Sequence, residues 1–293
     1  MANQIKLAQG YSAVIDEVYQ AASTSAVLNS DRGLAKAGAS AREIVIPKVS
    51  VTGLGDYDRN SGYTQGSVTL EYETVTFDYD RGCAIVVDAM DAAETEAVNA
   101  FTVAESELQR TQVAPESDAY TFAKLAGSEG VTTVTADYAD ALAVLNGLDE
   151  AMGAMDEAQV SGGRILFITP TLARKVRAYN ASSASSTNSA HVWEEFAQVV
   201  EVPQARFYSA ITLNDGKDGA NFGYKKAADG HNLNWMIVEP TAVFRFDKHV
   251  HSRILSPDEL ENMDAYKLKY RKYGIAGVFA NKAAGVAVSV ASA

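Results

Sequence analysis

Two stretches near the start of the chain have the apolar and polar pattern of β-strands, the first from its β-branched residues and the second from alternation. The first, residues 42–51, is rich in β-branched side chains, and Pro47 favours a sheet edge because it has no amide donor. The second covers residues 67–82, and residues 52–66 between them are dense in the Gly, Asn, Asp and Ser that turns require. The pattern predicts a long β-hairpin with an exposed tip. Because an isolated hairpin is marginal in water, it should pack on another part of the chain or on another subunit.

The second of these strands changes phase along its length. Val68 and Tyr72 lie on one face, whereas Phe77 and Tyr79 follow the opposite alternation. An extra residue in a β-bulge near Thr74 would account for the shift. We therefore expect one continuous strand with bulky side chains on both faces.

Helical spacing of apolar residues begins at residue 91. Asp91 and Glu94 resemble a capping box, and apolar residues continue at helical spacing on one face after them. We expect a long helix from this point, ended or kinked by Pro115. A second helical stretch should then close on Gly127.

The stretch that opens at Val131 has the pattern of a separate α/β region. A helix is expected over 137–158, followed by a buried strand at 164–169 and by a helix with Pro170 in its first turn. The residues predicted to point inward from the first helix are Leu142, Leu145, Leu148, Met152 and Met155. Further expected elements are loops at 181–190 and 216–232, strands at 199–211, 235–239, 242–255 and 285–291, and a helix-to-strand transition over 258–274.

The composition is that of an ordinary soluble globular protein, with 293 residues, 47% apolar and 21% charged. The first residues lack the apolar run of a signal peptide, and no segment approaches the about 18 apolar residues of a membrane span. We therefore expect folding in a cytoplasm and no membrane contact. A single cysteine, Cys83, excludes an intramolecular disulfide and a zinc site built on several thiolates.

The net charge of −12 argues against a nucleic-acid-binding surface, which needs clustered Lys and Arg. The charge is uneven: residues 91–160 hold fourteen carboxylates against Arg110 and Lys124, whereas eight bases face five acids from Pro240 onward. Opposite patches suit head-to-tail self-association, although such a bias more often reflects solvated helix faces.

No set of residues forms a convincing catalytic, cofactor or metal site. His249 and His251 share a strand face, but no Cys, Asp or Glu stands at a matching offset, so we read them as surface or interface histidines. Cys83 opens an apolar run and is expected in core packing. An α/β enzyme that uses the acidic helix 137–158 and this histidine pair is the alternative, and it would require a pocket and a bound metal.

Several stretches resemble, in order and in sequence, the major capsid proteins of tailed bacteriophages with the Hong Kong 97-type fold. The stretches that carry the resemblance are 55–82, 87–95, 107–119, RILFITPT, VVEVPQARFY and 247–282. The resemblance implies an α+β capsid fold with four parts: an N-terminal arm (1–41), an extended β-hairpin loop (42–85), a P domain with a spine helix (86–128 and 240–293) and an α/β A domain (129–239).

The same resemblance implies a structural subunit rather than an enzyme, with no cofactor. Copies would assemble into pentamers and hexamers of an icosahedral head, in which the hairpin, hinged near Gly82, packs on a neighbouring subunit's P domain. The shell would enclose double-stranded DNA without sequence-specific binding. Portal, scaffolding and decoration proteins are the implied partners, in the host cytoplasm during assembly and then in the virion. An encapsulin-like cellular compartment that holds a cargo enzyme is the alternative within the fold.

Some members of this family join their subunits by an isopeptide bond between a lysine of the extended loop and an asparagine of a neighbour. No lysine lies between Lys48 and Lys124, so the hairpin tip offers no amine and we expect a non-covalent shell. The residues expected at the subunit interface are Tyr57, Asp58, Arg59, Asn60, Tyr63, Tyr72, Phe77, Tyr79, Arg81, Arg110, Lys248, Arg253 and Arg271.

Overall fold

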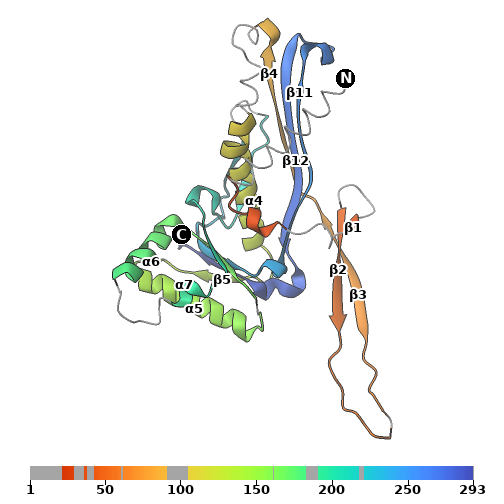
Figure 1. Cartoon of the computed structure of the whole chain (residues 1–293), viewed down its shortest axis with the longest axis vertical. Coiled ribbons are helices and arrows are strands. Elements are labelled where there is room, and N and C mark those ends of the chain that lie inside the picture. Colours follow the sequence, from red (N-terminus) through yellow and green to blue (C-terminus); the bar gives the residue numbers. More distant parts are fainter. Residues whose placement is uncertain are drawn as a thin grey trace.

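The computed structural model has three parts: an extended hairpin, a long three-stranded sheet with a helix along it, and a five-stranded sheet covered by helices (Figure 1). The structure describes residues 22–29, 36–37, 43–60, 62–90, 105–160, 162–182, 191–217 and 221–292. The mix of helices and sheets is that of the predicted α+β class.

The hairpin pairs β2 (Glu43–Val51) with β3 (Val68–Thr76) in antiparallel register, and β1 (Lys36–Ala37) adds a short strand to β2. The predicted hairpin is confirmed. The predicted bulge near Thr74 is wrong, because Thr74 pairs with Val45 in a register that runs without a break along the whole of β3. Figure 1 shows the hairpin extending away from the rest of the chain.

The change in apolar alternation along this stretch has another cause: the chain passes from the hairpin sheet to the long sheet. After Phe77 and Asp78, β4 (Tyr79–Asp88) leaves the hairpin and joins the long sheet. The predicted hinge near Gly82 is also wrong. Gly82 lies inside β4 opposite Arg271, with the carbonyl oxygen of Tyr270 only 2.7 Å from where a Cβ would stand.

The long sheet has the order β11-β12-β4, all antiparallel, with β11 (Val243–Leu255) and β12 (Ala265–Val278) as predicted strands. These strands run side by side along the long axis of the molecule (Figure 1). The helical part expected after residue 258 amounts to one 3-10 turn, η7 (Pro257–Glu259). A capping box on Ser256 fixes this turn.

The helix beside the long sheet continues through the position where proline was expected to end or bend it. Residues 105–108 are α-helical, η3 (Gln109–Val113) is a π-helical segment, and α4 (Ala114–Ala126) follows. Pro115 lacks an amide donor, and the wider π turn stands immediately before it. Gly127 caps α4 as predicted, whereas the expected start at residue 91 lies outside the described residues.

The five-stranded sheet has the order β5-β13-β10-β6-β7. Its strands are β5 (Thr132–Thr135), β13 (Val286–Val290), β10 (Leu233–Val238), β6 (Ile165–Ile168) and β7 (Gln198–Glu201). Helices α5 (Ala141–Glu157), α6 (Pro170–Ser182) and α7 (His191–Glu194) pack on one face, and α4 packs on the other through Phe122 and Leu125. The buried strand at β6 and the proline that begins α6 are confirmed.

One predicted core residue of α5 is wrong. Leu142 is 46% exposed, and Val144 is buried instead. Asp140 caps the helix by accepting a hydrogen bond from the Ala143 amide, which starts the helix at Ala141. The buried stripe passes through Leu145 and Leu148, and Leu142 lies about 60° beyond Leu145 on the solvent side of the helix.

The remaining short elements are η1 (Ala26–Leu28), η5 (Gln204–Arg206), β8 (Ile211–Leu213), β9 (Tyr224–Lys226), η6 (Pro240–Ala242) and η8 (Ala280–Gly285). The strand predicted over 199–211 is therefore interrupted, because η5 separates β7 from β8. In the part of the chain that the structure describes, no helix is both long and apolar enough to cross a bilayer.

Candidate subunit interface

The tip of the hairpin is an ordered turn. Asp58 and Gly62 form an antiparallel bridge, with hydrogen bonds of 3.2 and 2.7 Å between their amides and carbonyls. The Asp58 side chain also accepts a 2.7 Å bond from the Asn60 amide, and Gly62 supplies the positive φ that closes the turn. Tyr57 and Tyr63 pack beside this turn with their rings tilted and the ring centroids 4.9 Å apart. The structure thus brings four predicted interface residues together.

The hairpin carries much of the apolar surface that the chain leaves exposed. Of fifteen large apolar side chains that are exposed among the described residues, seven belong to it, so the exposure is concentrated in one element. They are Val51, Leu54, Tyr57, Tyr63, Val68, Leu70 and Tyr72. Concentrated apolar exposure of this kind marks a surface that another molecule covers.

The root of the hairpin is fixed to the body by aromatic contacts. Phe77 stacks on Tyr273 at 5.1 Å, and Tyr79 packs on Tyr120 at 4.7 Å. The Tyr120 hydroxyl donates to Asp78, and burial together with this bond raises the pKa of Tyr120. Phe77 and Tyr79 were expected at a subunit interface, but they are buried inside their own chain and leave little surface for a neighbour.

Arg81 makes its contacts within the chain as well. Its Nε and Nη2 donate to the two carboxylate oxygens of Glu116 at 2.6 and 3.2 Å. Its Nη1 and Nη2 also reach the carbonyls of Asn214 and Gly223 at 2.7 and 3.2 Å. The hydrogen bond with Glu116 raises the pKa of Arg81. Arg81 therefore links β4, α4 and the two ends of the loop between β8 and β9.

Three other predicted cations pair on the surface. Arg110 contacts Glu107 at 2.8 Å, Arg253 contacts Glu259 at 2.7 Å, and Arg271 contacts Asp80 at 2.6 Å. All three arginine side chains stay more than half exposed, so a neighbouring subunit can still reach them. Arg59 is exposed at the hairpin tip, and the side chain of Lys248 lies outside the described residues. A role of these residues between subunits stays a prediction.

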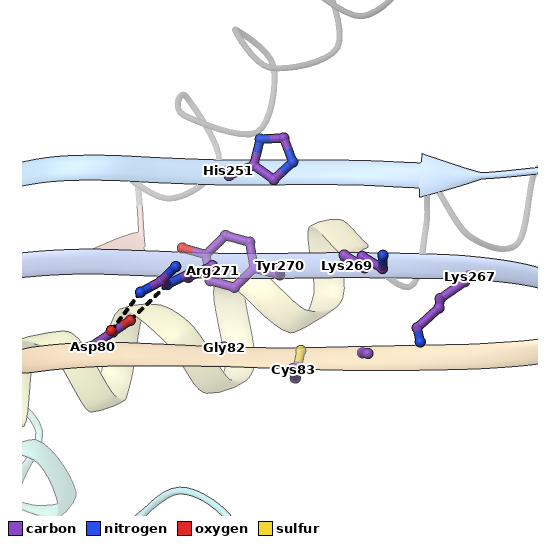
Figure 2. A pocket seen from close by; sticks show the side chains of 9 residues that line it. Asp80, Gly82, Cys83, His251, Lys267, Lys269, Tyr270 and Arg271 are labelled. Carbon is purple, nitrogen blue, oxygen red and sulfur yellow. Dashed lines mark hydrogen bonds and ion pairs between the residues drawn. The ribbon is translucent and has the colours of Figure 1, made fainter. Parts of the chain in front are cut away.

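A shallow depression of about 530 Å³ lies on the long sheet (Figure 2). We call it the basic depression, and it is lined by Asp80, Gly82, Cys83, Ala84, His251, Lys267, Lys269, Tyr270 and Arg271. The strand register places Gly82 opposite Arg271 and Ala84 opposite Lys269, so long cationic side chains stand beside very small ones. Lys267 and Lys269 were not among the predicted interface residues. The alternation Lys-x-Lys-x-Arg places three cations on one strand face, and it could have indicated them.

The depression contains one cysteine and one histidine, Cys83 and His251. Burial raises the pKa of Cys83, which disfavours the thiolate that a nucleophile needs. Cys83 is half-buried on a sheet surface, and the residues after it in β4 are exposed or half-buried, so the expected core position is wrong. Among the described residues, no group of three His, Cys, Asp or Glu side chains gathers closely enough to hold a metal ion.

Comparison with known proteins gave matches to solved structures. No family model matches the chain, and no curated protein matches it. The capsid of cyanophage P-SCSP1u matches with a TM-score of 0.57 at 13% identity, over 86% of this chain and 84% of that chain. The mature capsid of bacteriophage PhiM1 matches with a TM-score of 0.53 at 13% identity, over 86% and 82%. The chain has the phage capsid fold.

The capsid fold also occurs in another kind of particle. A virus-like particle from Pyrococcus furiosus matches with a TM-score of 0.52 at 10% identity, over 85% of this chain and 86% of that chain. The capsid fold confirms the predicted fold class, while the predicted domain boundaries stay predictions. Two strands lie across these predicted parts. β4 crosses the predicted end of the hairpin loop at residue 85, because it belongs to the long sheet from Tyr79 onward. β13 was assigned to the P domain, and it pairs with β5 and β10 in the five-stranded sheet.

Proposed function

We propose that the chain is a major capsid protein, the structural subunit of an icosahedral phage head that encloses double-stranded DNA. The observation that carries the proposal is the hairpin, which extends from the body and exposes apolar residues such as Leu54 and Tyr63. A hairpin of this kind is stable only when it packs on something. The match of the whole chain to phage capsid structures supports a neighbouring copy as that partner.

The hairpin of one copy packs on the long sheet of the next in this proposal. The segment 43–78 holds six carboxylates against two cations, Lys48 and Arg59. The basic depression presents Lys267, Lys269 and Arg271 on one strand face. Opposite charges on the two surfaces favour this pairing and select its orientation. Interfaces of this kind, repeated around pentamers and hexamers, stabilise a closed shell without any covalent bond between subunits.

The role is structural, and the partners follow from it. A shell of this kind needs no sequence-specific contact with the DNA inside, which agrees with the net charge of −12. Portal, scaffolding and decoration proteins are the proposed further partners. Assembly takes place in the host cytoplasm, and the product is the virion.

The first test removes apolar surface from the hairpin and, separately, from elsewhere. Leu54→Ser with Tyr63→Ser should strongly reduce the assembled fraction in sedimentation velocity, because it removes the exposed contacts of the tip. Leu142→Ser with Phe222→Ser changes two side chains that are also exposed but lie outside the hairpin, and assembly should be unaffected. Equal effects of the two pairs would refute the hairpin as the assembly element.

The second test addresses the charge pairing. Lys267→Glu with Lys269→Glu reverses two charges of the basic depression, and assembly should fail at low salt. Lys225→Glu with Lys226→Glu is the matched control, because these exposed lysines lie on β9, which belongs to a different sheet and does not line the basic depression. Assembly that tolerates the first pair as well as the second would show that the depression is not the receiving surface.

A cellular compartment that holds a cargo protein is the second candidate function. The match to a virus-like particle from Pyrococcus furiosus favours it, because the fold alone does not separate the two kinds of shell. The content of purified particles decides between them. Nuclease-protected double-stranded DNA supports the phage head, and a protein cargo without nucleic acid supports the compartment.

A further inference from the structure

A single buried carboxylate receives an unusual number of hydrogen bonds from a distant part of the chain. Asp118 in α4 is 0% exposed, and its neighbours in space are Ser23, Thr24 and Ser25. Their hydroxyls donate to it at 2.6, 2.9 and 2.6 Å. The amides of Thr24 and Ser25 donate at 2.9 and 3.2 Å. Three consecutive residues thus wrap around one carboxylate.

A third element completes the cluster. Arg206 in η5 donates from Nη1 to the Asp118 carboxylate at 3.2 Å and to the carbonyl of Ala22 at 2.9 Å. The arginine therefore contacts both the carboxylate and the segment that wraps it. Among the described residues, all six hydrogen bonds that the structure gives to Asp118 come from this segment and Arg206.

The apolar contacts of the same region join the same three elements. Leu28, three residues after Ser25, is buried in one cluster with Phe122 of α4 and Phe207, the residue after η5. The rings of Phe122 and Phe207 meet edge to face at 5.0 Å. Segment 22–29, α4 and η5 are thus held together by an apolar contact and by an ionic one.

We propose that Asp118, Arg206 and Ser23–Ser25 form a clasp that makes docking of segment 22–29 depend on the relative position of α4 and η5. Each member depends on the other two. Without the segment, the buried carboxylate loses five of its six donors; without Arg206, its charge loses its ion-pair partner. Because an unpaired buried charge is costly, the clasp holds as a unit or opens as a unit.

The consequence for assembly rests on the proposed function, whereas the clasp itself does not. A shell subunit takes slightly different shapes at different lattice positions, so a clasp that joins α4 to η5 couples the N-terminal segment to those shapes. Displacement of η5 would release segment 22–29, and docking of the segment would resist that displacement.

The test is hydrogen exchange on the unassembled subunit, so its result does not depend on shell formation. The variant Asp118→Asn keeps the shape but removes the charge, and exchange of the Thr24 and Ser25 amides should rise on the order of ten-fold or more, because bonds to a charged acceptor are the strong ones. The clasp further predicts faster exchange of the Arg206 and Phe207 amides, which a mere anchor for the segment would not change. Glu107→Gln, an exposed carboxylate in the same helical stretch, is the control and should change neither region.

A second variant keeps the test decisive if Asp118→Asn does not fold. Ser23→Ala with Ser25→Ala removes two hydroxyl donors while the carboxylate and Arg206 remain. Faster exchange at both segment 22–29 and η5 supports the clasp. Unchanged exchange in both regions, or a change confined to the segment, overturns it.

Discussion

Glu116 of α4 holds Arg81 of β4 through both of its carboxylate oxygens, at 2.6 and 3.2 Å. The same guanidinium reaches the carbonyls of Asn214 and Gly223, so a single side chain joins the long sheet, the helix and the β8–β9 hairpin. A lysine cannot replace it, because the ammonium lacks the planar fork that makes these contacts together.

Arg81→Lys should therefore lower the free energy of unfolding by about 1.5–3 kcal/mol, the range for hydrogen bonds to charged groups. Urea denaturation followed by circular dichroism measures it. Arg110→Lys is the control, because its pair with Glu107 is exposed and should be worth no more than about 0.5 kcal/mol. Equal losses in the two variants would contradict the bridging role of Arg81.

Leu148 and Leu142 of α5 should respond very differently to truncation. Leu148 is fully buried under the five-stranded sheet, so Leu148→Ala should cost about 2–5 kcal/mol through lost burial and a cavity. Leu142 faces solvent, and Leu142→Ala should stay within about 0.5 kcal/mol of the wild type. Thermal or urea unfolding of the two variants checks which face of α5 is buried. A large loss of unfolding free energy in Leu142→Ala would show that Leu142 is buried as well.

Replacing two glycines by alanine should change the free energy of unfolding in opposite directions. At Gly82 a Cβ would stand 2.7 Å from the Tyr270 carbonyl oxygen, so Gly82→Ala should destabilise by about 1–3 kcal/mol as β4 is pushed away. At Gly153, inside α5, a Cβ meets nothing within 4 Å, and Gly153→Ala should stabilise by about 0.5–1 kcal/mol. The melting temperatures should move in opposite directions, and a neutral Gly82→Ala would contradict the close contact of β4 with β12.

The free energy of unfolding should fall in alkaline solution, because Tyr224 ionises more easily in the unfolded state. Burial raises the pKa of Tyr224 from 10.0 to about 12, and its hydroxyl donates to the Ala205 carbonyl at 2.7 Å. Below pH 10 both folded and unfolded states keep the proton, so the contribution is fully present. Between pH 10 and about 12 only the unfolded state ionises, and the contribution is progressively lost. Burial raises the pKa of Tyr120 and adds to the loss in the same direction.

Urea unfolding across this pH range, with phenolate absorbance as the titration signal, measures the effect. Tyr224→Phe should show a flatter fall in stability with pH than the wild type. An identical slope in the two proteins would show that Tyr224 does not titrate as its burial requires.

The sequence predicted the elements whose pattern is local. The period-two alternation located the hairpin and β11, and Pro170 marked the start of α6. It could not locate the junction at residues 77–78, because a strand that changes sheets looks like a strand with a bulge when its partners are unknown. Leu142 shares the i, i+3 spacing of Leu145 and Leu148, so the local pattern did not show that packing on the sheet leaves Leu142 exposed.

The candidate interface was predictable at the hairpin tip and not at its root. Tyr57 and Tyr63 lie in a turn-forming stretch with no apolar neighbours to bury them, so their exposure follows from local sequence. The partners of Arg81 lie 35 and more than 130 residues away, and no local pattern distinguishes such a residue from Arg110 on the surface. Asp118 was missed for the same reason, because five of its hydrogen bonds come from residues 93 to 95 positions earlier and the sixth from Arg206, 88 positions later.

Electron microscopy of the purified chain, combined with size-exclusion chromatography, shows whether the chain assembles into a shell. We expect closed shells, tubes or capsomer-sized rings for the wild type, and their loss when Leu54 and Tyr63 are both changed to Ser. A wild-type protein that stays a monodisperse monomer, with a hairpin that is stable in isolation, would contradict this expectation.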